Sequence, residues 1–127
     1  MQFIRLAPHV TSGRFFDSNG LPAGIGWGAL EVPGELPQDA FALEIVGPAF
    51  LPLYRDGDLI VVSPSVPTKL GDRVLVKARS GELTVRVVGL RTAKTIEFYP
   101  LIGAKHELIA MSAADVEWMS RILWARQ

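Results

Sequence analysis

Serine and lysine are the side chains through which this chain could carry out nucleophilic catalysis. A serine and a lysine could in principle form a dyad of nucleophile and base in this chain, although the geometry of such a site would have to be assembled from separate segments. A lysine can act as the base because burial lowers its pKa toward about 7 to 8. The candidate serines are Ser12, Ser63, Ser65, Ser80, Ser112 and Ser120, and the candidate lysines are Lys69, Lys77, Lys94 and Lys105. The sequence alone does not bring any of them together.

Three other patterns are interpreted as structural rather than chemical. His9 and His106 lie far apart, which argues against a shared metal site. The glycines of "GIGWG" at 24–28 lack the spacing of a phosphate loop and follow no buried strand, so this stretch is predicted to be a turn. The acidic turn "RDGD" at 55–58 is not a calcium loop, because 54–67 lacks the further oxygen ligands and the glutamate at position twelve. We therefore expect no metal and no cofactor.

Composition limits the classes of function. The chain has 127 residues, which suits one domain, and its 13 Lys and Arg balance 13 Asp and Glu, so no overall charge attracts nucleic acid or an anionic membrane. Arg55, Asp56 and Asp58 interrupt the most apolar region, so no run reaches the roughly 18 residues of a membrane span. The start "MQFIRLAPHV" is a poor secretory signal, and the absence of cysteine suits a reducing compartment. We expect a cytoplasmic protein.

The sequence predicts two regions of different texture within a single domain, 1–127. Residues 1–40 are rich in glycine and proline, which predicts an irregular arm made of turns and extended segments. Residues 41–127 carry short runs rich in Val, Ile and Leu between turn residues, which predicts a β core. The predicted strands begin at Phe41, Asp58, Asp72, Leu83 and Lys94. The predicted fold class is mainly β, with one curved sheet.

The C-terminal segment "VEWMSRILWARQ" is predicted to be extended, with a helical turn at "SAAD" before it and a helix as the alternative. In a strand, Trp118, Ile122 and Trp124 would share one face, while Met119 and Leu123 would lie on the other. A lone edge strand that is apolar on both faces needs a cover, either the core of its own subunit or a second subunit. No pair of adjacent helical patterns is present, so the sequence does not predict a helix-turn-helix DNA reader.

Several motifs in order resemble the self-cleaving domain of LexA-like repressors and UmuD. They are "FALEIVG", "PLYRDGDLIVV", "GDRVLVK", "GELTVR", "RTAKTIE" and "DVEWMSRILWARQ", with "FFDSNGLPAGIGW" upstream resembling the phage-repressor-type branch. The resemblance covers almost the whole chain. It implies the curved β-sheet fold of the Ser-Lys peptidase superfamily, which also contains bacterial signal peptidases.

The resemblance also implies that the catalytic residues have been replaced. Active members read Gly-Asp-Ser-Met after the first core strand, whereas this chain has Gly47, Pro48, Ala49 and Phe50. An alanine methyl cannot attack a carbonyl. The family's lysine base falls on Arg86, and a guanidinium with a pKa above about 12 does not accept a proton. We expect Arg86 to hold its charged head in solvent, with an ion pair to a carboxylate such as Glu44 as the alternative.

The bond that self-cleaving members cut is also altered. The family's Ala-Gly pair lies in a segment that matches "PHVTSGRFF" here, so that Val10 and Thr11, or Ser12 and Gly13, take its place. Because Pro48, Phe50 and Leu51 differ from the family pattern as well, natural loss of activity is favoured over deliberate inactivation of an enzyme. Whether Ala49 and Arg86 are natural or engineered stays open.

The resemblance therefore implies a pseudoenzyme with a role in binding. We expect a catalytically inactive domain that serves dimerisation or partner binding in a bacterial or phage transcriptional regulator. The expected interface of a homodimer contains Trp118, Ile122 and Trp124, and DNA would be reached only through a helix-turn-helix domain absent from this chain. One alternative is an engineered, inactivated self-cleaving peptidase. Another is a UmuD-like accessory protein of the DNA-damage (SOS) response that binds a protein partner.

Overall fold

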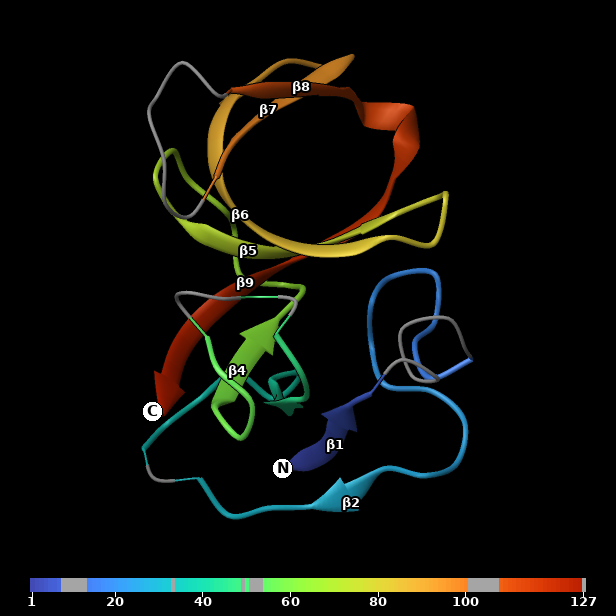
Figure 1. Ribbon diagram of the computed structural model, residues 1–127, viewed down its shortest axis with the longest axis vertical. Helices are drawn as coiled ribbons and strands as arrows, with labels where there is room; N and C mark the ends of the chain where they lie inside the picture. Colours follow the sequence, from blue (N-terminus) through green and yellow to red (C-terminus); the bar gives the residue numbers. More distant parts are fainter. Residues whose placement is uncertain (8–13, 33, 49, 51–53, 101–107, 127) are drawn as a thin grey trace.

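The computed structural model describes residues 1–7, 14–32, 34–48, 50, 54–100 and 108–126, and this part is built almost entirely from strands. Nine strands and one short 3₁₀ turn follow one another along these residues (Figure 1). They are β1 (Gln2–Leu6), β2 (Gly28–Ala29), β3 (Phe41–Ile45), β4 (Leu59–Ser63), β5 (Arg73–Ala78), β6 (Leu83–Arg91), β7 (Thr95–Tyr99), β8 (Ile109–Ser112), η2 (Ala113–Asp115) and β9 (Val116–Arg126). The mainly β fold predicted from the sequence is confirmed.

The five predicted core strands are β3 to β7. Each begins at the predicted residue or one residue later, because a turn residue stands at its start. The Gly81 turn between β5 and β6 has φ of +99°, which a glycine adopts without steric cost. The helical turn predicted at "SAAD" is η2, and the extended reading of the last segment is confirmed by β9.

The strands form one sheet in the order β2-β1-β3-β4-β9-β5-β6-β7-β8. All neighbours are antiparallel except β1 and β3, which run parallel. The sheet curves strongly, so that β5 to β8 and the start of β9 wrap into a rounded half at the top of Figure 1, while β1 to β4 form the other half. A single strand, β9, runs from one half into the other.

Each flank of β9 is paired along only half of the strand. Its first half pairs with β5, from Val116 opposite Ala78 to Arg121 opposite Val74. Its second half pairs with β4, from Arg121 opposite Ser63 to Arg126 opposite Leu59. Arg121 is the residue at which both pairings meet. β9 is therefore not a lone edge strand, because it lies between two neighbours that each cover a different half.

The strand at the start of the chain was not predicted from the sequence. Residues 1–40 were expected to be irregular, but β1 enters the sheet beside β3, with Phe3 opposite Ala42 and Leu6 opposite Ile45. Ile4 and Leu6 are buried there. The short alternation of β1 is a weak signal by itself, and parallel pairing with a distant strand is what stabilises it. Apart from β2, the other described residues of this region, 1, 7, 14–27, 30–32 and 34–40, lie outside the regular strands, as predicted.

Three clusters of buried side chains hold the sheet. The first cluster lies on one face and consists of Ile4, Leu6, Phe41, Leu43, Ile45, Tyr54, Ile60, Val62, Leu75, Val85 and Trp118. The second cluster, inside the rounded half, consists of Val74, Val76, Val88, Ile96 and Phe98. The third cluster consists of Ala40, Ala42, Leu59 and Val61. The first cluster contains residues from both halves of the sheet and therefore joins them.

The N-terminal segment is anchored on the first cluster by aromatic rings. Phe16 contacts Trp118, Phe41 and Trp27 with ring centroids 5.2, 6.0 and 5.6 Å apart. The indole N–H of Trp27 donates to the carbonyl oxygens of Phe15 and Ala23, both at 3.1 Å. These contacts satisfy the polar atom of a large apolar ring. The chain bends at Gly24 and Ile25, and Trp27 packs against the first cluster as predicted, but Gly28 already belongs to β2.

A β-bulge separates the aromatic residues of β9. Between β4 and β9 the register shifts, so that Val62 lies opposite Ile122 but Val61 lies opposite Trp124. Leu123 is the extra residue of the bulge. Trp118 belongs to the first cluster and Ile122 packs against it, whereas Trp124 packs against the third. The prediction that these three side chains share one face is therefore wrong for Trp124.

Within the described ranges, no helix is long and apolar enough to cross a membrane.

Gly20 should be far more sensitive to substitution than Gly34. Both have positive φ, of 82° and 98°, which costs an alanine about 1–2 kcal/mol. A Cβ at position 20 would also lie 2.8 Å from Cδ2 of Trp118, whereas nothing lies within 4 Å of a Cβ at position 34. Overpacking adds about 1–3 kcal/mol. Urea unfolding of Gly20→Ala and Gly34→Ala measures the difference, and equal losses would contradict the packing of Trp118 described here.

Candidate functional site

The turn at 55–58 holds the segment that follows β3. The amide of Gly47 donates to Oδ1 of Asp56 at 2.9 Å, and the amide of Ile45 donates to the carbonyl of Asp58 at 2.7 Å. The amide of Gly57 returns a bond of 2.8 Å to the carbonyl of Ile45. Gly47 itself has φ of +82°, which turns the chain sharply away from the strand. Ile45 and Gly47, which lead to position 49, are thus held by hydrogen bonds to their main-chain atoms.

Phe50 and Tyr54, the first two described residues after position 49, pack in the core. The amide of Tyr54 donates to the carbonyl of Phe50 at 3.0 Å. Tyr54 is buried within the first cluster, and Phe50 packs against the same cluster. Ala49 lies outside the described residues. Its two flanks are held by contacts that do not depend on the side chain at position 49.

The acidic turn is a hydrogen-bonded turn and not a metal ligand set. Oδ2 of Asp58 accepts from the amide of Arg55 at 2.8 Å, and Asp58 is buried. This carboxylate satisfies main-chain donors of its own turn. In the part of the chain that the structure describes, no three His, Cys, Asp or Glu residues lie together as metal ligands. His9 and His106 lie outside that part.

Arg86 lies in β6 opposite Val74 of β5, and its side chain is half-buried. Val74 and Val88 belong to the second cluster, and strand alternation places Arg86 on their face of the sheet. Phe50 and Tyr54 pack on the first cluster, as does Val85 next to Arg86. The guanidinium makes no ion pair with any residue that the structure describes.

Glu44 is not the partner of Arg86. Its Oε2 lies 2.8 Å from Nε of Arg5, on the neighbouring strand β1. The parallel register places these two residues directly opposite each other. The ion pair suggested as an alternative for Arg86 is therefore formed by Arg5, which sequence reasoning missed because β1 was not recognised.

Two of the candidate serines bind a carboxylate. The hydroxyl of Ser63 donates to Oδ1 of Asp39 at 2.8 Å, and the amide of Ser65 donates to Oδ2 at 3.1 Å. Burial raises the pKa of Asp39, but the hydrogen bonds from Ser65 and Ser63 lower it by more, so the pKa lies below its ordinary value of 3.8. A carboxylate with a lowered pKa is a poor base, so we interpret this cluster as structural. Its hydrogen bonds connect the end of β4 to the loop at 37–40.

Ser120 has a fully buried hydroxyl without a hydrogen-bond partner among the described residues. It lies in β9 opposite Leu75, on the face of the first cluster. These surroundings are apolar, so Ser120 is interpreted as a small residue that fits beneath neighbouring side chains. Of the remaining candidates, Ser12 and Lys105 lie outside the described residues, as do the predicted cleavage-region residues Val10, Thr11 and Gly13.

A groove follows the open edge of β9. Residues 122–126 pair with β4 on one flank, and no described strand pairs with their other flank. A cavity of about 260 Å³ lies there, lined by Tyr54, residues 71–73 and residues 121–125. Arg121 closes one end, with its Nε 3.5 Å from Oδ2 of Asp72.

The three residues predicted for an interface differ in their exposure and in their position relative to the groove. Ile122 and Trp124 line the groove and are partly exposed, whereas Trp118 is 6% exposed and belongs to the core. Tyr54 and residues 71–73 were not predicted as part of this surface. Tyr54 comes from a distant segment, and residues 71–73 lie beside β9 because β5, which begins at Arg73, pairs with it.

Comparison with known proteins identifies one family. The model of the family described as Peptidase S24-like matches residues 12–123. This range includes the segment after β3, the turn at 55–58, Arg86 and most of β9. Among curated proteins, none matches the chain.

The Asp39 cluster should make a pH-dependent contribution to stability. A carboxyl whose folded pKa is lowered stabilises the protein above its unfolded pKa, and the contribution is lost as the pH falls through the folded value. Asp39→Asn should therefore cost about 1 kcal/mol or less at neutral pH, and the difference from wild type should shrink as the pH falls through the lowered folded pKa. Urea unfolding at several pH values measures it. Glu35→Gln, at an exposed carboxylate, is the control, and a constant Asp39→Asn difference would contradict the assignment.

Proposed function

Because the chain belongs to the Peptidase S24-like family, we propose that it is a member without peptidase activity that serves as a dimerisation domain of a bacterial or phage transcriptional regulator. Two features of the sequence support the loss of activity. Ala49 provides no nucleophile at the family's serine position, and Arg86 cannot take a proton at the family's lysine position. The DNA-reading helices would belong to another part of the protein or to a partner.

The hydrogen bonds around position 49 explain how the fold persists without the reaction. Asp56 and Asp58 bind the main chain of the turn and of Gly47, and Tyr54 binds the main chain of Phe50. None of these bonds involves the side chain of residue 49. The frame that would present a nucleophile is therefore stable with alanine in its place.

The observation that carries the proposed dimer is the open edge of β9. Residues 122–125 present one unpaired flank beside a groove, and Ile122 and Trp124 line it with partly exposed apolar surface. Unpaired strand edges bind other strands unless charge, proline or a cover protects them. A second copy can pair its own residues 122–125 antiparallel to these, which produces a two-fold contact. Such symmetry suits a regulator that binds paired half-sites.

The protein should remain intact under conditions in which active family members cut themselves. Incubation at alkaline pH or with a RecA filament should leave one mass, measured by intact mass spectrometry, because neither nucleophile nor base is present. A defined cut between residues 9 and 14 would contradict the assignments of Ala49 and Arg86.

Restoring both catalytic side chains should still give little cleavage. In Ala49→Ser with Arg86→Lys, Pro48 and Phe50 remain altered, and so does the family's scissile pair. The lysine would also extend from the face of β6 that carries the second cluster. Mass spectrometry of the double variant measures cleavage, with Arg86→Lys alone as its control. Efficient cutting would show that these two substitutions are enough to restore activity, and it would contradict the proposed natural loss of activity.

A charge on the open edge of β9 should separate the dimer without unfolding the subunit. Ala125 is exposed and lines the groove, so Ala125→Arg should yield a folded monomer by light scattering, with an unchanged circular dichroism spectrum. Ala114→Arg, at an exposed alanine far from the groove in sequence, should stay dimeric. Trp124→Ala should weaken the dimer and also lower stability, since Trp124 packs against the third cluster. A wild-type monomer at ~100 µM, or a dimeric Ala125→Arg, would contradict the proposed interface.

A further inference from the structure

The edge of β1 is covered over only part of its length. β2 is two residues long and pairs with β1 through Gln2 and Phe3. Gly26, with φ of +103°, turns the preceding chain away from β1. The flank of β1 beyond Phe3 therefore has no described strand beside it, whereas its other flank is paired with β3 as far as Leu6.

The backbone of Arg5 faces this open flank. The amide of Leu30 donates to the carbonyl of Met1 at 2.8 Å, so Met1, Phe3 and Arg5 direct their main-chain polar groups to the side of β2. The carbonyl of Arg5 already accepts from the amide of Ala7 at 2.9 Å. The amide of Arg5 is left to face the space beyond the end of β2, where an added strand would place a carbonyl.

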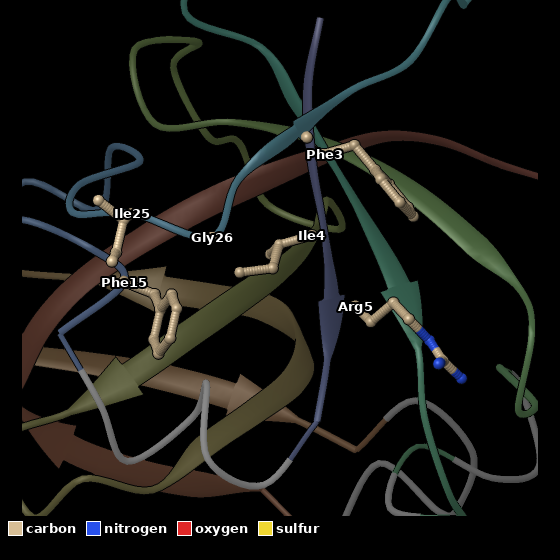
Figure 2. Close-up of a pocket in the computed structure, with 7 residues that line it drawn as sticks. Phe3, Ile4, Arg5, Phe15, Ile25 and Gly26 are labelled. Carbon is tan, nitrogen blue, oxygen red and sulfur yellow. The ribbon is translucent and has the colours of Figure 1, made fainter.

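An apolar groove lies along the same flank. Its volume is about 570 Å³, within the range of peptide and ligand sites, and it is lined by Phe3, Ile4, Arg5, Phe15, Ile25, Gly26 and Gly28. Figure 2 shows Ile4, Phe15 and Ile25 on one side of β1, and Phe3 and Arg5 extending to the other. Ile25 is 91% exposed, the most exposed of the large apolar side chains in the described residues. Water-exposed apolar surface of this kind gains free energy when a partner covers it.

An arginine side chain lies beside the groove. The side chain of Arg5 is 68% exposed, and its Nε lies 2.8 Å from Oε2 of Glu44. A guanidinium has five donors, so Arg5 retains N–H groups that can bind a second carboxylate. An extended segment that occupies the groove would meet apolar side chains on one face and this guanidinium on the other.

We propose that this groove binds an extended segment of a partner protein in which apolar and acidic residues alternate. The segment adds as a strand beyond β2, with a main-chain bond to the amide of Arg5. Its apolar residues contact Ile4, Phe15 and Ile25, and its acidic residues face Arg5, because side chains of a strand alternate between faces. This site is separate from the open edge of β9, and it does not depend on the proposed dimer.

Fluorescence anisotropy of labelled peptides tests the proposal on the full chain. The probe is a fluorescein-labelled peptide containing Asp-Leu-Asp-Leu-Asp, compared with the same peptide carrying Lys for Asp and with one carrying Ser for Leu. The Asp and Leu peptide should bind at least about tenfold more tightly than either comparison peptide. Equal affinity for the Lys version would overturn the proposal, and so would equal affinity for the Ser version.

Two variants locate the binding without disturbing the core. Ile25→Ser removes an exposed apolar wall, and Gly28→Val adds a side chain to a residue that lines the groove, on the face of Phe3, because a Cβ at position 28 lies 3.7 Å from the carbonyl oxygen of Phe3 and 3.9 Å from its Cδ1. Each should weaken peptide binding about fivefold or more. Leu90→Ser, at a 67% exposed leucine in β6, and Ala29→Val, beside Gly28, are the matched controls and should bind normally. Unchanged affinity in both groove variants, or a change of oligomeric state in Ile25→Ser, would overturn the assignment of a partner segment to this groove.

Discussion

The structure depends on the way in which β9 is shared between two halves of the sheet. Its first half completes the rounded half through β5, and its second half completes the flatter half through β4. Arg121, at which the pairings meet, is also bound to Asp72 at the start of β5. Because neither neighbour extends along the whole strand, the arrangement that closes the core also leaves one flank of residues 122–126 open. The proposed interface is a consequence of the same pairing that unites the fold.

The first cluster joins the two halves of the sheet although the pairing of β9 is divided between them. Its side chains come from both halves, with Ile60 and Leu75 among those that are fully buried. Trp118 belongs to it and is covered in turn by Phe16, while Gly20 lies against its indole ring. These residues of the N-terminal segment therefore cover the core. The ring of Phe16 and the missing side chain of Gly20 both fit against Trp118 of β9.

At the candidate site, the main-chain structure on either side of position 49 is held independently of the side chain at that position. Positions before and after Ala49 are held by bonds from Asp56, Asp58 and Tyr54 to main-chain atoms. Such bonds stabilise the turn whatever side chain stands at position 49, so the proposed loss of a serine would carry little cost in folding. The family likeness over residues 12–123 is compatible with this independence of the turn from one side chain.

The sequence by itself determined the local elements. Runs of β-branched residues between turns predicted β3 to β7 to within one residue, and the sequence also contains the alanine and arginine on which the proposed loss of activity depends. Only the tertiary structure decided what depends on contacts between distant segments. The parallel pairing of β1 with β3, the ion pair of Arg5 with Glu44, and the bulge that moves Trp124 to the opposite face all arise from strand register. Local sequence specifies the preference of a segment for a strand, but it does not specify which strand lies beside it, because that choice is made by the packing of the whole core.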